Sequence, residues 1–194
     1  MRSVAEALRR IPQVPEPSSP SDPQVEPPVT RRGLVTVLAV AAVVAALDQL
    51  TKAWALGALE PGVRRPLIGD LLGLQLISNP GAALSIATGM TWVLTVIAVV
   101  VVVVVVRASR KIASTGWALT FGLLLGGALG NLVDRLVRAP GPLRGEVVDF
   151  IAYGRLFIGN VADIAIVVAA GLVMVLVARG VRLIGTRERA RADA

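Results

Sequence analysis

The stretch ATGMTWVLTVIAVVVVVVVV, residues 87–106, decides the fold class of this chain. It carries no charged residue and ends in eight consecutive valines. Valine favours strands in water, but an isolated strand leaves its backbone groups unsatisfied in lipid, whereas a helix satisfies them internally. Because about 20 apolar helical residues cross a bilayer, this stretch predicts a transmembrane helix.

Three other segments have the same character, at residues 33–59, 112–133 and 156–178. The whole chain is 55% hydrophobic and 17% charged, with a mean hydropathy of +0.73, which is too apolar for an ordinary soluble domain. We therefore predict an all-α membrane protein with four transmembrane helices. A small extracytoplasmic loop or β element is expected to complete it.

The two ends of the chain differ from its middle. Residues 1–30 are rich in Pro, Ser and Glu and contain no apolar run, so they are predicted to form a disordered cytoplasmic tail. Residues 31–180 form the predicted four-helix membrane domain. Residues 181–194 form a second, basic tail, also predicted to be cytoplasmic.

Lys and Arg residues indicate the orientation of the predicted spans. They cluster before the first span, between the second and third, and after the fourth, whereas the opposite loops mix Arg with acidic residues. Both termini are therefore expected on the cytoplasmic side. The residues concerned are Arg31, Arg32, Arg107, Arg110, Lys111, Arg179, Arg182, Arg187, Arg189 and Arg191.

The composition also excludes several kinds of chemistry. The chain has no His and no Cys, so imidazole bases, thiol nucleophiles and the usual zinc and haem ligands are missing, and we expect neither metal nor cofactor. The net charge of +7 does not indicate a nucleic-acid partner, because stacking aromatics are scarce and the Arg residues lie beside apolar runs. Catalysis would have to use carboxylates, hydroxyls, Lys or Arg.

Polar residues converge on the outer ends of the predicted spans. Ionisable groups at membrane depth are costly and mark functional sites by default, so this convergence predicts a site near the outer leaflet. Its candidates are Asp48 and Lys52, Asn79 and Ser85, Asn131, Asp134 and Arg135, and Asn160 and Asp163.

Asp48 and Lys52 are spaced i, i+4, so they share one helix face and can form an ion pair. That pair could be purely structural. Asp134 is followed directly by Arg135, which would hold it ionised, and we favour a structural role for Asp134.

Asp163 has no cation within four residues in sequence and lies about one-third of the way into the fourth predicted span. It therefore needs a partner from elsewhere. In one continuous helix, Asp149 would lie about 21 Å away. A turn at residues 153–155 would instead let Asp149 fold back on a short strand or loop, although an ordinary solvated loop residue is the alternative.

Two glycine-containing motifs predict local geometry. Pro80 and Gly81 predict a sharp turn before the second span. Gly126, Gly127 and Gly130 predict close helix packing.

Five motifs occur in a fixed order: DQLTK (48–52), NPGAALS (79–85), GNLVDR (130–135), VVDF (147–150) and NVAD (160–163). Together they resemble the lipoprotein signal peptidases, or signal peptidase II, over residues 33–178. The resemblance implies a multi-pass aspartic peptidase of the bacterial cytoplasmic (inner) membrane, with its active site near the outer leaflet. Its substrates would be prolipoproteins, cut just before a diacylglyceryl-modified cysteine. Membrane lipids are also expected partners, and we expect the protein to function as a monomer.

The resemblance also implies residue roles. The catalytic carboxylates would be Asp149 and Asp163, and Asp134 would be structural. One departure is Gly159, where family members commonly have an aromatic residue. The residues that would shape the pocket and bind substrate are Asp48, Lys52, Asn79, Asn131, Arg135 and Asn160.

In such a pair one carboxyl keeps a proton while the other activates water. The greater depth expected for Asp163 favours it as the protonated member.

Two other functions remain open. One is a hydrolase with Lys52 as base and Ser85 or Ser78 as nucleophile, and the other is a small proton or ion transporter using Asp48, Asp134 and Asp163.

Overall fold

The computed structural model of the chain describes residues 31–81, 91–110, 112 and 114–183. Within these residues lie four helices, each long and apolar enough to cross a membrane, which confirms the four predicted spans. They are α2 (Arg31–Ala58), α3 (Thr91–Ser109), α4 (Thr115–Val137) and α5 (Val161–Ala178). The predicted tail at residues 1–30 and most of the basic tail lie outside the described residues.

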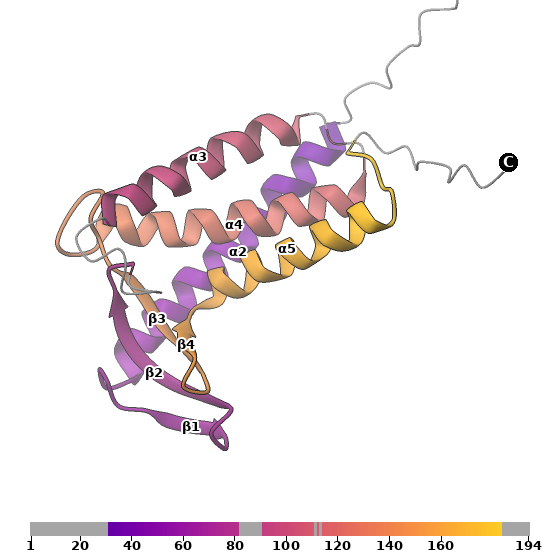
Figure 1. The fold of residues 1–194 in the computed structure, drawn as a ribbon. Helices are drawn as coiled ribbons and strands as arrows, with labels where there is room; N and C mark the ends of the chain where they lie inside the picture. The colour runs from indigo at the N-terminus through magenta and orange to yellow at the C-terminus, as the bar shows by residue number, and fades with distance from the viewer. Residues whose placement is uncertain (1–30, 82–90, 111, 113, 184–194) are drawn as a thin grey trace, which may run out of the picture.

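Helix α4 is the centre of the bundle and packs against α2, α3 and α5 (Figure 1). Its glycines form the contact surface, as predicted. A Cβ added at Gly126 would lie 2.6 Å from the Val44 Cβ of α2, and one added at Gly127 would lie 2.6 Å from the Ala162 carbonyl oxygen of α5. These backbones approach too closely for any larger residue.

Substituting Gly126 by Val is expected to lower the melting temperature of the detergent-solubilised protein by several degrees, because overpacking costs about 1–3 kcal/mol. Gly57→Ala, in α2, is the matched control, since a Cβ there meets nothing within 4 Å. Thermal unfolding followed by tryptophan fluorescence would measure both. Equal melting temperatures would contradict the packing role of Gly126.

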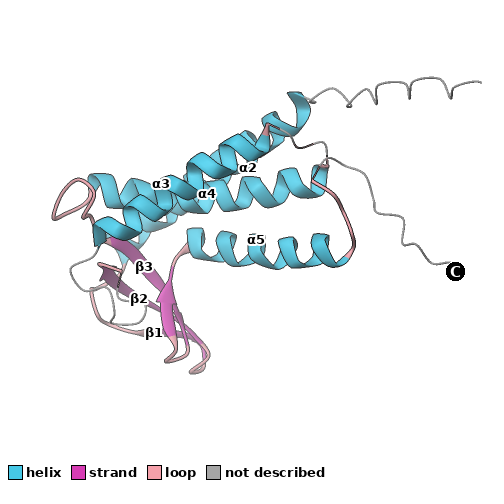
Figure 2. Ribbon diagram, turned by 45° about the horizontal axis from the view of Figure 1, so that its top comes forward, coloured by secondary structure: helices cyan, strands magenta, loops and turns pink. Residues whose placement is uncertain are grey.

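A four-stranded antiparallel sheet connects the segment between α2 and α3 to the segment between α4 and α5. Its strands, in spatial order, are β1 (Arg65–Ile68), β2 (Leu72–Asn79), β3 (Val147–Tyr153) and β4 (Phe157–Gly159). The predicted turn at residues 153–155 connects β3 to β4, so Asp149 does lie on a strand that folds back. Strands β1 and β2 were not predicted. The fold is therefore four membrane-spanning helices plus a small sheet (Figure 2), rather than all-α.

The predicted boundary of the fourth span was wrong. Helix α5 begins at Val161 rather than at residue 156 because residues 157–159 pair with β3, and apolar content does not distinguish a short strand from the first turn of a helix. Asp163 consequently lies in the first turn of α5, not one-third of the way along it. In space, the sheet lies at one end of the bundle, while α2 begins and α5 ends at the other (Figure 1).

Candidate active site

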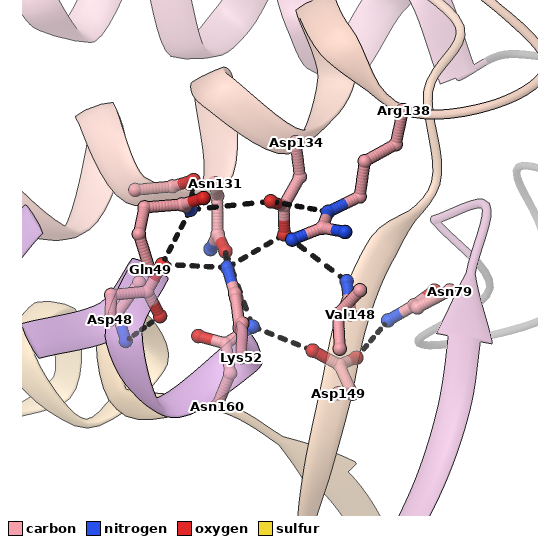
Figure 3. Close-up of polar contacts among 12 residues, drawn as sticks. Asp48, Gln49, Lys52, Asn79, Asn131, Asp134, Arg138, Val148, Asp149 and Asn160 are labelled. Carbon is pink, nitrogen blue, oxygen red and sulfur yellow. Dashed lines mark hydrogen bonds and ion pairs between the residues drawn. The ribbon is translucent and has the colours of Figure 1, made fainter. Parts of the chain in front are cut away.

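Strand β3 places Asp149 against the helical bundle. Asp149 pairs with Ile77 of β2, and the next residue, Phe150, packs edge-on against Trp54 of α2. The Asp149 side chain is buried, and both of its carboxylate oxygens accept amide hydrogen bonds. The donors are Asn79 Nδ2 at 2.7 Å and Asn160 Nδ2 at 2.6 Å (Figure 3).

The start of α5 places Asp163. Asn160 caps the helix: its side-chain oxygen accepts from the Asp163 backbone N–H at 3.0 Å, while Asp163 Oδ2 accepts from the Asn160 N–H at 3.1 Å. This reciprocal capping box restricts the Asp163 carboxylate to the helix end. Its other oxygen accepts from Asn131 Nδ2 at 3.0 Å. Asn160 thus contacts both aspartates, and Asn131 contacts Asp163 from α4.

Gly159, the departure from the family pattern, borders the same carboxylate. A Cβ at this position would lie 2.9 Å from Asp163 Oδ2, closer than such contacts normally occur. Asn160 nevertheless keeps its capping and bridging contacts. Glycine at this position therefore leaves room for the capped carboxylate.

Both aspartates line one groove of about 870 Å³. They interact electrostatically as like charges, and their predicted catalytic pairing stays a prediction. Burial, together with the negative charge of Asp163, raises the pKa of Asp149 to about 6, while hydrogen bonds from Asn79 and Asn160 oppose the rise. The groove is lined by Arg64, Gln75, Ile77, Ser78, Asn79, Pro80, Asp149, Gly154, Arg155, Leu156, Phe157, Ile158 and Asp163.

Behind the groove lies a fully buried ion cluster. Lys52 Nζ lies 2.7 Å from Asp48 Oδ2 and 2.8 Å from Asp134 Oδ2, and it donates to Asn131 Oδ1 at 3.1 Å. The predicted Asp48–Lys52 pair is therefore confirmed. Neither residue lines the groove, so their predicted contact with substrate stays a prediction.

The predicted pairing of Asp134 with Arg135 was wrong. The neighbouring Arg135 does not pair with it; the carboxylate is held by Lys52 and by Arg138 Nε, at 2.7 Å. Consecutive helix residues point about 100° apart, whereas residues four apart share a face. Asp134 also accepts from the Val148 backbone N–H at 3.2 Å, a contact suited to the structural role predicted for it.

Arg135 is buried but incompletely bonded. In the part of the chain that the structure describes, its Nη1 is the single buried side-chain nitrogen or oxygen without a hydrogen-bond partner. The guanidinium interacts electrostatically with Asp149 and Asp163. An unpaired buried donor is costly. Arg135 is not among the residues that line the groove, so its predicted contact with substrate stays a prediction.

Sequence reasoning missed two polar residues of the cluster. Gln49 Nε2 contacts Asp48, Asp134 and the Gly130 carbonyl. Arg138 follows Asp134 at i+4, the same spacing that identified Asp48 and Lys52, so that rule would have found it. No comparable spacing signal exists for Gln49.

Comparison with known proteins places most of the chain in one family. The family described as signal peptidase (SPase) II matches residues 40–179. A protein of Rhodococcus jostii (strain RHA1) named lipoprotein signal peptidase is 51% identical over 173 residues, covering 89% of this chain and 86% of the relative. A lipoprotein signal peptidase of Mycobacterium avium (strain 104) is 48% identical over 178 residues, covering 92% of this chain and 96% of the relative.

Two solved structures, both described as bacterial membrane enzymes, share the fold. One has a TM-score of 0.68 and 25% identity, covering 82% of this chain and 94% of that chain. The other has a TM-score of 0.64 and 28% identity, covering 74% and 92% respectively. The fold of this chain is therefore similar to that of known bacterial membrane enzymes.

Proposed function

Because the chain belongs to the signal peptidase II family and is a multi-pass membrane protease of the lipoprotein signal peptidase type, we propose that it cleaves by an aspartic mechanism with Asp149 and Asp163 as catalytic residues. The observation that supports this most directly is the groove that both carboxylates line. Each carboxylate is also held by two hydrogen bonds from the surrounding residues. Such an arrangement is preorganised for a bound water and a peptide carbonyl.

A charge count supports a single proton on the pair. The connected cluster contains four carboxyls and three cations, which leaves one negative charge in excess. Asp48 and Asp134 are ion-paired, so the neutralising proton belongs to the catalytic pair, as expected for two carboxyls in a low-dielectric site. The carboxyls are Asp48, Asp134, Asp149 and Asp163, and the cations are Lys52, Arg135 and Arg138.

We assign that proton to Asp149 rather than to Asp163, contrary to the expectation from depth. Asp149 is the more buried of the two, whereas Asp163 lies in the first turn of α5, where negative charge is favourable. Asp163 removes a proton from water, whose oxygen attacks the scissile carbonyl carbon, and Asp149 protonates the carbonyl oxygen. The carbon–nitrogen bond of the tetrahedral intermediate then breaks as Asp163 returns its proton to the leaving amine. One hydroxyl of the intermediate gives a proton back to Asp149, which leaves the product carboxylic acid and the starting state of the pair.

The pH profile is expected to report the shared proton. Because the pKa of Asp149 is raised to about 6, kcat/KM should fall as the pH rises above that value, by about tenfold per unit once the proton is lost. Asn79→Ala removes a hydrogen bond that lowers this pKa, so the decline should move to higher pH. A decline that Asn79→Ala does not move would contradict the assignment.

Substrate binding is assigned to the groove and to Arg135. We propose that Arg135 Nη1 donates to a peptide carbonyl next to the scissile bond. Asn79, Asn131 and Asn160 act on the reaction through the two carboxylates that they hold. The proposed substrate is a diacylglyceryl-modified prolipoprotein, cleaved before the modified cysteine, with the enzyme acting as a monomer among membrane lipids.

The alternatives receive less support. Lys52 contacts two carboxylates and an amide oxygen rather than a hydroxyl, so a Ser–Lys hydrolase lacks its base, and Ser85 lies outside the described residues. For a transporter, Asp48 and Asp134 would need to titrate, yet both are in ion pairs. Family membership favours peptidase chemistry over both.

We further propose that the sheet end faces away from the cytoplasm, which puts the catalytic pair near the outer leaflet and both termini inside. Arg107, in the last turn of α3, and Arg110, directly after it, lie at the opposite end of the bundle. They support this orientation because cytoplasmic loops are rich in Lys and Arg. Protease accessibility of tags at either terminus in right-side-out vesicles would test the topology.

The direct test of function uses the purified full chain in detergent with a diacylglyceryl-modified prolipoprotein. Mass spectrometry should show a product that begins at the modified cysteine. An unmodified prolipoprotein is the matched substrate control. Failure to cleave the modified substrate, with the protein folded by its melting curve, would contradict the proposal.

A further inference from the structure

The buried ion cluster contacts the main chain next to each proposed catalytic residue. Asp134 Oδ2 accepts from the N–H of Val148, which directly precedes Asp149. Asp48 Oδ1 accepts from the N–H of Ala162, at 3.0 Å, which directly precedes Asp163. Two carboxylates from different helices therefore hold equivalent main-chain positions on the two segments that carry the pair.

Among the described residues, Lys52 is the one cation that contacts both of these carboxylates. Its Nζ lies within 2.8 Å of an oxygen of each, and the three side chains are fully buried. Figure 3 shows dashed lines from the Lys52 ammonium to the carboxylates of Asp134 and Asp48. Without this cation, two buried like charges would face one another, which is unfavourable.

We propose that Lys52 is a positioning residue that couples the two halves of the catalytic site through the main chain, and that it makes no contact with substrate. The inference rests on the proposed function, since it takes Asp149 and Asp163 as the catalytic pair. Removing the ammonium forces Asp48 or Asp134 to turn away or to take up a proton. Either change weakens an acceptor for the Val148 or Ala162 N–H and moves a carboxylate that must be placed within a fraction of an ångström.

Lys52→Met tests the coupling. Its kcat should fall by about 100-fold while KM changes less than about threefold, because substrate binding in the groove is untouched. Hydrogen exchange measured by mass spectrometry should increase in both segments, around residues 145–150 and 160–165, although Lys52 contacts neither backbone.

A compensating variant separates positioning from general destabilisation. In Lys52→Met/Asp48→Asn, the Asn oxygen still accepts from the Ala162 N–H and the second buried negative charge is removed, so kcat should recover by about tenfold relative to Lys52→Met. Because the second substitution also relieves the repulsion between buried carboxylates, kcat is compared between variants that are both folded by their melting curves.

Arg138→Met is the matched control cation. Arg138 also pairs with Asp134 but contacts only that carboxylate, and its side chain is one-quarter exposed, so water can replace it. Its kcat should fall less than about threefold.

The proposal would be overturned by an unchanged kcat in Lys52→Met, whether or not KM rises. No recovery of kcat in the double variant, or an equal loss of kcat in Arg138→Met, would overturn it as well. Exchange confined to one segment would also overturn it. If Asp149→Asn instead cleaves normally, the catalytic pair itself is wrong, whereas the exchange experiment still reports on Lys52.

Discussion

Asp149→Asn and Asp163→Asn are each expected to lower kcat by about 10⁴-fold or more. Asparagine keeps the size and an acceptor oxygen of aspartate but cannot transfer a proton, so either substitution leaves the pair without its base or its acid. Cleavage of the diacylglyceryl-modified prolipoprotein, followed by mass spectrometry, measures the loss. Asp70→Asn is the matched control, because Asp70 lies exposed in the turn between β1 and β2 and should retain full activity.

Melting temperatures of the two Asn variants show whether a loss of activity comes from lost chemistry or from unfolding. The pKa of Asp149 is higher in the folded protein than its ordinary value of 3.8, so the folded state binds more protons than the unfolded state between about pH 4 and 6. That contribution favours folding at low pH and is lost as the pH rises through about 6. Asp149→Asn removes the burial of a charge and should melt at or above the wild-type temperature at pH 7. Substantial activity in either folded Asn variant would reject the aspartic mechanism.

Arg135→Gln is expected to lower kcat/KM by about 10- to 100-fold. Arg135 Nη1 is buried and unpartnered among the described residues, and loss of a hydrogen bond from a charged donor to a peptide carbonyl costs about 1.5–3 kcal/mol, which is roughly 10- to 100-fold in rate. Arg135→Lys should recover only part of the loss, because Lys keeps the charge but lacks the planar fork of donors. Steady-state kinetics on the modified prolipoprotein would measure both variants.

The division of this effect between kcat and KM identifies when the contact forms. A loss in kcat alone means that Arg135 contacts the transition state, whereas a rise in KM alone means that it binds the ground state. Arg144→Gln, an exposed arginine in the loop after α4, is the matched control and should keep wild-type values. An Arg135→Gln variant within threefold of wild type would remove Arg135 from the proposed site.

Local sequence patterns predicted the features that depend on neighbouring residues. The length of the apolar runs predicted four spans, i, i+4 spacing predicted the Asp48–Lys52 pair, and the glycines predicted the close approach of α4 to its neighbours. The turn at residues 153–155 was also predicted, because without it the two aspartates could not meet. The start of α5 was not predicted correctly, because the apolar residues of β4 match the pattern of a membrane helix as well as that of a strand.

By itself, therefore, the sequence determined that this is a membrane protein whose polar residues gather at one end of its spans, and which carboxylates were available for catalysis. Only the tertiary structure decided which of them pair. Asp134 is bound by Lys52 from α2 and not by the adjacent Arg135, and Asn160 bridges Asp149 to Asn131. Buried polar groups take whichever partner the packing brings within hydrogen-bond distance, and here those partners come from segments far apart in the chain.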